Sequence, residues 1–412
     1  MLPPQKEKIL LILLAAIQFT NIVDFMIMMP MGKILQDTLQ ISPSKYGFLV
    51  SSYGLSAGIT SLAGVFYLDR LDRKKALLTA YLGFILGTMS SAILPNTDSP
   101  EANYYIFIGT RILTGITGGL LGGLVLSIIG DTIPIERRGK AMAAVTISFS
   151  LASIIGMPIS LTLVDAYDNN WHVPFFAISL ISMVILLFAI KHIPTMRQHL
   201  ELGKKRDPWH TFKSAFTTPE QRSALTFTLL LVLGQFTVIS LMTPYYICNV
   251  NIEQSDIKYI YLVGGIATVF GGMSIGKMVD TYGRFRIFTI FAILSTIPIL
   301  IVTHLGPTPL WIVLIVAAFF MVFISGRMIP ANTITSAVVP PQYRASFMSL
   351  NSAAMSLGSG SSAALAGVMV SQQGLNQPYE GYNTVGYLAV AATIVSLFLI
   401  RFLKTAGAQK TH

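Results

Sequence analysis

The sequence has almost no cysteine and few charged residues for its length. Cys248 is the only cysteine among 412 residues, which excludes an intramolecular disulfide framework. Only 11% of the residues are charged, whereas soluble domains carry about 25%. Acidic residues are the scarcer kind, with 18 Asp and Glu against 28 Lys and Arg. A water-soluble protein of this composition would expose large apolar patches and aggregate, so we expect a membrane protein.

Sequence signatures of nucleotide-driven and metal-dependent chemistry are also missing. The segment from Gly271 to Lys277 has the glycine spacing of a phosphate-binding loop, but Met278 stands where such a loop needs Ser or Thr. The six histidines show no metal-ligand spacing. The methionines between positions 26 and 31 favour packing over soft-metal binding. We therefore expect no enzymatic activity, no cofactor and no bound metal.

Long apolar runs make up most of the chain, in which 53% of residues are hydrophobic and the mean hydropathy is +0.66. A helix needs about twenty apolar residues to cross the hydrocarbon layer of a membrane. Twelve such segments are predicted, at 9–30, 46–68, 76–95, 104–130, 141–164, 172–191, 223–246, 256–279, 287–304, 310–333, 345–371 and 383–403. The predicted fold is an all-α integral membrane protein with two pseudo-symmetric six-helix bundles. We predict the first bundle over 1–192, a cytoplasmic connecting loop over 193–222 and the second bundle over 223–412.

The net charge of +10 is spread along the chain rather than gathered in a nucleic-acid-binding patch. Basic residues cluster before the first span, in the central segment and in alternate turns, while the other turns hold only Lys33, Lys45 and Lys258. This asymmetry follows the positive-inside rule and predicts that both termini and the central loop are cytoplasmic. The first apolar run continues for about twenty residues without a small-residue cleavage site, so we interpret it as a span rather than a signal peptide.

Two charged turns occur in both halves of the chain. The turn from Asp69 to Lys75 has an echo in the turn from Asp280 to Arg286. A second pair is formed by the segments that begin at Pro134 and at Pro340. Repeated short turns between apolar segments predict a duplicated membrane bundle. In transporters, paired halves of this kind rock around a central binding site.

The repeated turn resembles a motif that follows the second helix in the major facilitator superfamily, Gly-x-Leu-x-Asp-Arg-x-Gly-Arg-Lys. The first copy matches it at Asp69, Arg70, Arg73 and Lys74, with Val65 and Asp72 in place of glycines. The second copy matches it at Gly276, Asp280, Gly283 and Arg284, with Thr281 in place of the basic residue. With twelve predicted helices and a central loop, the resemblance covers essentially the whole chain. It implies a conformational gate at these turns, with local helix capping as the alternative.

Two further motifs resemble the drug and sugar efflux branch of that superfamily, the arabinose efflux permease-like proton antiporters. The segment from Arg111 to Gly115 resembles the Arg-x-x-Gln-Gly motif of the fourth helix, with Thr114 in place of glutamine. The break at Gly156 and Pro158 is similar to a Gly-Pro-rich motif of exporters. We expect this break to bend or pack a helix rather than bind substrate, because proline lacks a backbone donor.

Asp24 is the only acidic residue deep within a predicted span, where a carboxylate is costly enough to indicate function. Arg111 is its expected partner, because both lie roughly 10 Å below the outer boundary at a rise of 1.5 Å per residue. Burial favours the neutral acid and a guanidinium favours the carboxylate, so the sequence leaves the protonation state open. The resemblance implies that Asp24 and Arg111 couple proton movement to transport; a static ion pair or structural anchor is the alternative.

Polar and aromatic residues within the predicted spans form the candidate substrate cavity. Arg327 could bind an acidic substrate group or the carbonyls of a helix end, and the sequence offers no acidic partner for it in the second half. The other candidates suit an amphipathic solute better than a small ion, although each residue alone could equally serve helix packing. They are Gln18, Asn21, Tyr53, Gln235, Tyr245, Tyr246, Asn249, Asn332 and Asn351.

The sequence therefore predicts a secondary transporter of a bacterial inner membrane, which works by alternating access and exports a small organic solute in exchange for protons. Its expected partners are the solute, protons and membrane lipids, and we expect a monomer. A proton-coupled importer or facilitator of a sugar, siderophore or lipid-like solute is the alternative. A membrane sensor that does not transport is a remote alternative, since it would need an effector segment longer than the tail after Lys404.

Overall fold

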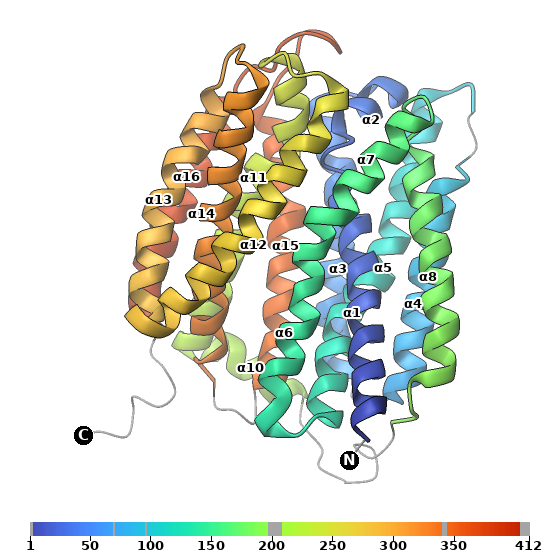
Figure 1. Ribbon diagram of the computed structural model, residues 1–412, viewed down its shortest axis with the longest axis vertical. Helices are drawn as coiled ribbons and strands as arrows, with labels where there is room; N and C mark the ends of the chain where they lie inside the picture. The colour runs from blue at the N-terminus through green and yellow to red at the C-terminus, as the bar shows by residue number, and fades with distance from the viewer. Residues whose placement is uncertain (1–2, 69–70, 95–96, 197–207, 340–343, 404–412) are drawn as a thin grey trace.

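The computed structural model describes residues 3–68, 71–94, 97–196, 208–339 and 344–403. Helices run along the long axis of the molecule (Figure 1), and the lower end carries the start of the first helix. The first half contains α1 Pro4–Met26, α3 Pro43–Tyr67, α4 Arg73–Ala92, α5 Pro100–Thr132, α6 Ile135–Leu151, α7 Met157–Ala166 and α8 His172–His192. The second half contains α11 Pro219–Cys248, α12 Ile257–Tyr282, α13 Arg284–His304, α14 Leu310–Ser336, α15 Arg344–Met369 and α16 Tyr382–Leu399, which ends in the short η4 Ile400–Phe402.

Length and composition make ten helices of the described chain capable of crossing a membrane. The helices α4 and α15 complete the set of twelve, with α6 and α7 together forming the fifth span. In the described ranges the only β pairing is an isolated bridge between Ser371 and Glu380. The prediction of an all-α protein with twelve spans is therefore confirmed.

Local sequence signals explain where the helices begin. Ser42 accepts a hydrogen bond from the Lys45 backbone at the start of α3, and Pro43 occupies the first turn, where its missing N–H is not needed. Asp72 caps α4 in the same way by accepting from the backbone of Lys74 and Lys75. Gly283 connects α12 to α13 with φ of 86°, a conformation that favours glycine.

The fifth span is interrupted where the sequence predicted a break. The helix α6 passes into a π-helical turn, η2 Ala152–Gly156, before α7 begins at Met157. Pro158 has no N–H to donate, so the regular hydrogen-bond ladder cannot continue through it. The turn places Gly156 directly against a side-chain methyl of Val23 on α1.

Two helices of the structure lie outside the predicted spans. The short helix α2 Gly32–Leu39 follows the first span. The helix α10 Pro208–Thr217 and the start of α11 fall inside 193–222, the segment predicted as the cytoplasmic connecting loop. The rings of Trp209 and Phe212 on α10 lie 5.8 and 5.2 Å from the ring of Phe66, and this packing stabilises the helix against the lower end of α3.

The two halves meet most closely where α3 crosses α15. A side-chain carbon on Gly54 would lie 2.6 Å from the Gly360 main chain, closer than real atoms approach. Gly47 and Gly367 form a similar contact nearer the upper ends of the same two helices. Ser51 adds a hydrogen bond of 2.5 Å to the Gly360 carbonyl. Small residues thus permit backbone contact between the halves, as they do in other membrane helix pairs.

Polar contacts close the upper end, where α2 meets the segment between α15 and α16. The Lys33 ammonium donates to the Leu375 carbonyl at 2.6 Å and to the Asn376 amide oxygen at 2.8 Å. The Tyr379 hydroxyl donates to Gln36 at 2.6 Å. Burial raises the pKa of Tyr379 well above its ordinary value, so this phenol remains a donor. We call these contacts the upper clasp.

The lower ends of the halves are further apart. In Figure 1 the ribbons of α12 and α13 diverge from those of α6 and α1 toward the lower end. On the lower part of α5, Gly122 and Gly130 have no neighbouring atom within 4 Å of a built side-chain carbon. In this view the lower ends of α12 and α13 therefore lie apart from those of α6 and α1.

We predict that Gly54→Leu lowers the melting temperature of the purified protein in detergent, because its side chain must push α15 away from α3. Overpacking of this kind typically costs about 1–3 kcal/mol. The matched control is Gly109→Leu on α5, where a side chain meets open space. Equal melting temperatures for the Gly54 variant and the wild type would show that α3 and α15 do not make this contact.

Candidate functional site

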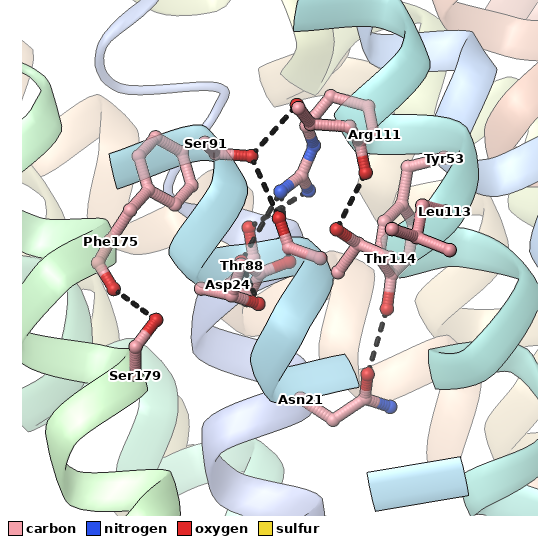
Figure 2. A network of polar contacts seen from close by, with 12 residues as sticks. Asn21, Asp24, Tyr53, Thr88, Ser91, Arg111, Leu113, Thr114, Phe175 and Ser179 are labelled. Carbon is pink, nitrogen blue, oxygen red and sulfur yellow. Dashed lines mark hydrogen bonds and ion pairs between the residues drawn. The ribbon is translucent and has the colours of Figure 1, made fainter. Parts of the chain in front are cut away.

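The structure brings Asp24 and Arg111 together in the interior of the first half (Figure 2). The Arg111 Nη1 atom lies 3.0 Å from one carboxylate oxygen of Asp24 and 3.2 Å from the other. Both side chains are completely buried, with 0% exposure. Asp24 and Arg111, which the sequence placed at equal depth on α1 and α5, therefore form a direct ion pair.

Further hydrogen bonds orient this pair. Thr88 on α4 donates to Asp24 Oδ1 at 3.1 Å, and Arg111 Nη2 donates to the main-chain carbonyl of Asp24 at 3.3 Å. The other carboxylate oxygen, Oδ2, receives no well-aligned hydrogen bond in the described part of the chain. Oδ2 is therefore the oxygen at which a proton would disturb the fewest existing contacts.

Aromatic rings cover the guanidinium. Its central carbon lies 4.9 Å from the ring centre of Tyr53 and 5.5 Å from that of Phe175. The Tyr53 hydroxyl in turn donates to Asn21 at 2.7 Å. Asn21 donates to the Gly118 carbonyl at 3.4 Å. Ring faces attract cations, so this environment favours a charged Arg111 while excluding water.

Glycines on α5 allow the neighbouring helices to reach the site. A side-chain carbon on Gly115 would lie 2.5 Å from the Tyr53 carbonyl, and one on Gly118 would lie 2.6 Å from the Tyr53 hydroxyl. Residues three and four positions apart lie on one face of a helix, so both glycines share a face with Arg111. This glycine face of α5 holds α3 close enough for Tyr53 to contact Arg111.

The π-helical turn connects this site to the second half. On one side, Gly156 touches Val23, the neighbour of Asp24. On the other side, the same turn meets α12, where a side-chain carbon on Gly265 would lie 3.0 Å from the Ile154 side chain. A displacement of Asp24 along α1 would therefore act directly on a contact between the halves.

Three of the predicted cavity amides have buried polar atoms without a partner among the described residues. These are Gln18 Oε1 on α1, Gln235 Oε1 on α11 and Asn351 Nδ2 on α15. Asn351 also accepts a hydrogen bond from Thr228 at 2.7 Å. Asn21 and Tyr53 are engaged with each other and with α5, as described above.

The remaining cavity candidates lie elsewhere. Tyr245 donates to the Leu305 carbonyl, and Asn249 exchanges two hydrogen bonds with the Tyr379 backbone, so both belong to the upper end. Tyr246 is buried there with an unpaired hydroxyl among the described residues. Asn332 is exposed on the lower part of α14.

Arg327 is completely buried and points toward α13 and α16. Its Nη1 atom donates to Thr393 at 2.7 Å and to Ser295 at 3.3 Å. Its Nε and Nη2 atoms have no partner in the described ranges, and no carboxylate there pairs with it. Two hydroxyl groups are therefore the hydrogen-bond partners of Arg327, for which the sequence offers no acidic partner in the second half.

The predicted gate residues make contacts within their own half. Arg73 donates to Asp131 on α5 at 3.0 Å and to the Leu68 carbonyl at 3.1 Å. Lys74 donates to the Ile190 carbonyl at the end of α8 at 2.8 Å. Asp69 and Arg70 lie outside the described residues.

The second copy of the gate motif has fewer contacts. Asp280 is exposed and forms no ion pair with any described residue, and Arg284 lies over the ring of its neighbour Phe285. Gly283 provides the tight turn. No group of three or more potential metal ligands occurs in the part of the chain that the structure describes.

Several residues of the site were missed from the sequence. Thr88 and Phe175 contact the ion pair, but a single Thr or Phe in an apolar run carries no signal of its own. Phe25 and Phe236, whose rings are 5.8 Å apart, connect α1 to α11. Phe236 could have been noticed, because Gln235-Phe236-Thr237 repeats the tripeptide Gln18-Phe19-Thr20.

Comparisons with known proteins agree with this architecture. The family model of the Major Facilitator Superfamily matches residues 14–250 and 224–411. An uncharacterized MFS-type transporter of Bacillus subtilis, YceJ, is 23% identical over 397 residues, with 96% of each chain covered. Multidrug resistance protein 2 of the same organism is 25% identical over 378 residues, covering 88% of this chain and 89% of the relative.

A solved structure shows the same fold. A crystal structure of a D-xylose-proton symporter superposes with a TM-score of 0.75 at 16% identity, covering 97% of this chain and 98% of the other. Sequence motifs, helices and family match therefore agree. The chain is an integral multi-pass membrane protein and belongs to the Major Facilitator Superfamily of transporters.

Proposed function

We propose that this transporter exports a small organic solute in exchange for protons by alternating access in a bacterial inner membrane. The observation that carries the proposal is the fully buried Asp24–Arg111 pair. In this arrangement the lower end faces the cytoplasm, as the positive-inside rule predicts for both termini. The similarity to a relative named multidrug resistance protein 2 supports the outward direction.

The ion pair has two charge states, one with Asp24 ionised and one with Asp24 protonated. With Asp24 ionised, Arg111 and Thr88 hold the carboxylate and fix α1 against α5 and α4. When a proton binds Asp24, the attraction to Arg111 is lost in a medium of low dielectric, where it is strongest. The side chain then moves away from the guanidinium, and Val23 transmits the movement to Gly156 and η2.

The second part of the mechanism is the exchange of contacts at the two ends. The upper clasp and the ion pair between Lys258 on α12 and Asp165 on α7, at 2.9 Å, hold the upper ends together. Opening toward the outside breaks these contacts. The charged turns at the lower end, including Arg73 and Asp280, then form contacts between the halves in their place.

We predict that Asp24→Asn abolishes solute uptake driven by an imposed pH gradient in proteoliposomes but retains solute counterflow. The amide cannot exchange a proton, so the gradient no longer biases the two states. The solutes used are those that stabilise the purified protein in a thermal-shift screen at two pH values. The matched control, Asp98→Asn at an exposed position, keeps gradient-driven uptake.

Gradient-driven uptake that survives in the Asp24 variant contradicts the coupling role. Counterflow that is independent of pH in the wild type indicates a facilitator instead. Uptake that follows the proton gradient in the same direction as the protons indicates an importer.

We also predict that Thr88→Val moves the pH midpoint of gradient-driven transport upward. Thr88 donates to the ionised carboxylate, so its removal favours the protonated acid at a given pH. A hydrogen bond to a charged group contributes about 1.5–3 kcal/mol, which corresponds to roughly one to two pH units. Thr117→Val, at a Thr of α5 whose hydroxyl bonds to carbonyls of its own helix, should leave the midpoint unchanged. A midpoint that moves downward or stays in place for Thr88→Val would exclude this hydrogen bond from the coupling.

A further inference from the structure

Two glutamines occupy equivalent positions in the two halves. The tripeptide Gln18-Phe19-Thr20 on α1 recurs as Gln235-Phe236-Thr237 on α11. The local geometry also recurs, because Thr20 donates to the carbonyl three residues earlier at 3.0 Å and Thr237 does the same at 3.1 Å. Both glutamines have a buried Oε1 atom without a partner among the described residues.

Such unpaired amides destabilise the folded protein until a bound group provides their hydrogen-bond partners. A buried polar group without a hydrogen bond lowers the stability of the folded protein. Gln235 is only 9% exposed, so bulk water does not satisfy it. Asn351, 1% exposed on the adjacent α15, presents an unpaired Nδ2. The two halves therefore offer hydrogen-bonding groups that no described residue uses.

The geometry of α1 shows which way its glutamine faces. Gln18, Asn21 and Phe25 are separated by three and four residues and so lie on one face of the helix. At the upper end of this face, the Phe25 ring contacts Phe236 of the second half at 5.8 Å and Tyr53 at 5.3 Å. Gln18 lies about 10 Å below Phe25, at a rise of 1.5 Å per residue, toward the lower end of α1.

In the described parts of α1 and α11, no charged residue lies within five positions of Gln18 or of Gln235. Asp24 and Arg111 neutralise each other and are 0% exposed, and Arg327 faces α13 and α16. A charged solute placed beside the amides would meet no opposite free charge. The loss of its hydration would therefore be unfavourable and not compensated by an opposite charge. Hydrogen bonds and ring contacts are the interactions that the region provides.

We propose that Gln18 and Gln235 bind an uncharged solute that carries hydroxyl or amide groups beside an apolar ring. Gln235 holds polar groups at the depth of Phe25 and Phe236, whose rings cover the apolar part. Gln18 holds polar groups about 10 Å lower from the first half, and Asn351 adds a donor from α15. An amide both donates and accepts, and its oxygen and nitrogen are interchangeable by rotation, so it matches a hydroxyl group in either role. This proposal rests on the transport function proposed above and names its substrate class.

The first test needs no ligand. Gln235→Met removes an unpaired buried amide at nearly constant volume, so it should raise the melting temperature of the purified protein. The matched control is Gln36→Met, because Gln36 is also buried but accepts a hydrogen bond from Tyr379, and its loss should lower the melting temperature. If Gln235→Met lowers the melting temperature as Gln36→Met does, Gln235 is a structural residue and the proposal fails.

The second test compares three probes that share a phenyl ring: phenyl β-D-glucoside, phenyltrimethylammonium and phenyl phosphate. In thermal-shift titrations only the uncharged glucoside should stabilise the wild type. Gln18→Met and Gln235→Met should each weaken its apparent affinity at least tenfold. A larger shift with either charged probe, no shift with the glucoside, or an unchanged affinity in both variants overturns the proposal. No proton gradient is involved, so this result is independent of the outcome for Asp24→Asn.

Discussion

The arrangement of the first half depends on one ion pair that is shielded from water. An isolated carboxylate or guanidinium is very costly in an apolar interior, and removing one partner of a buried pair typically costs about 3–5 kcal/mol. Neither Asp24 nor Arg111 can be buried at low cost without the other, so their ion pair holds α1 against α5. Thr88, the rings around the guanidinium and the glycine face of α5 all serve to keep that approach close.

The same constraint explains why a change in charge at one buried atom can reach the interface between the halves. The residue beside Asp24 packs on Gly156, and the π-helical turn that contains Gly156 also contacts Gly265 on α12. A π-helical turn has poorer hydrogen bonding than a regular helix and can rearrange at lower cost. The polar contacts at the upper end accompany a hydrophobic cluster to which both halves contribute, including Leu35 and Leu241, so opening there separates apolar surface as well as breaking hydrogen bonds and an ion pair.

The sequence predicted the spans well because apolar length alone determines them, and it located Asp24 and Arg111 because ionisable residues are conspicuous in apolar helices. It did not predict that Arg327 is held by hydroxyl groups, since Ser and Thr within spans usually bond to their own helix. Hydropathy also could not show that Asn249 belongs to the upper end or that α2 forms, because both depend on contacts with residues more than a hundred positions away.

The most direct test of the account is infrared difference spectroscopy of the purified protein during a pH titration, with Asp24→Asn as the reference. The account predicts a carboxylic acid C=O band that appears as the pH falls and is missing from the variant. It also predicts that this band shifts to a different pH range when solute is bound, because the solute favours one of the two states. A wild type that shows no Asp24-dependent band at any pH at which the protein remains folded would contradict the central claim.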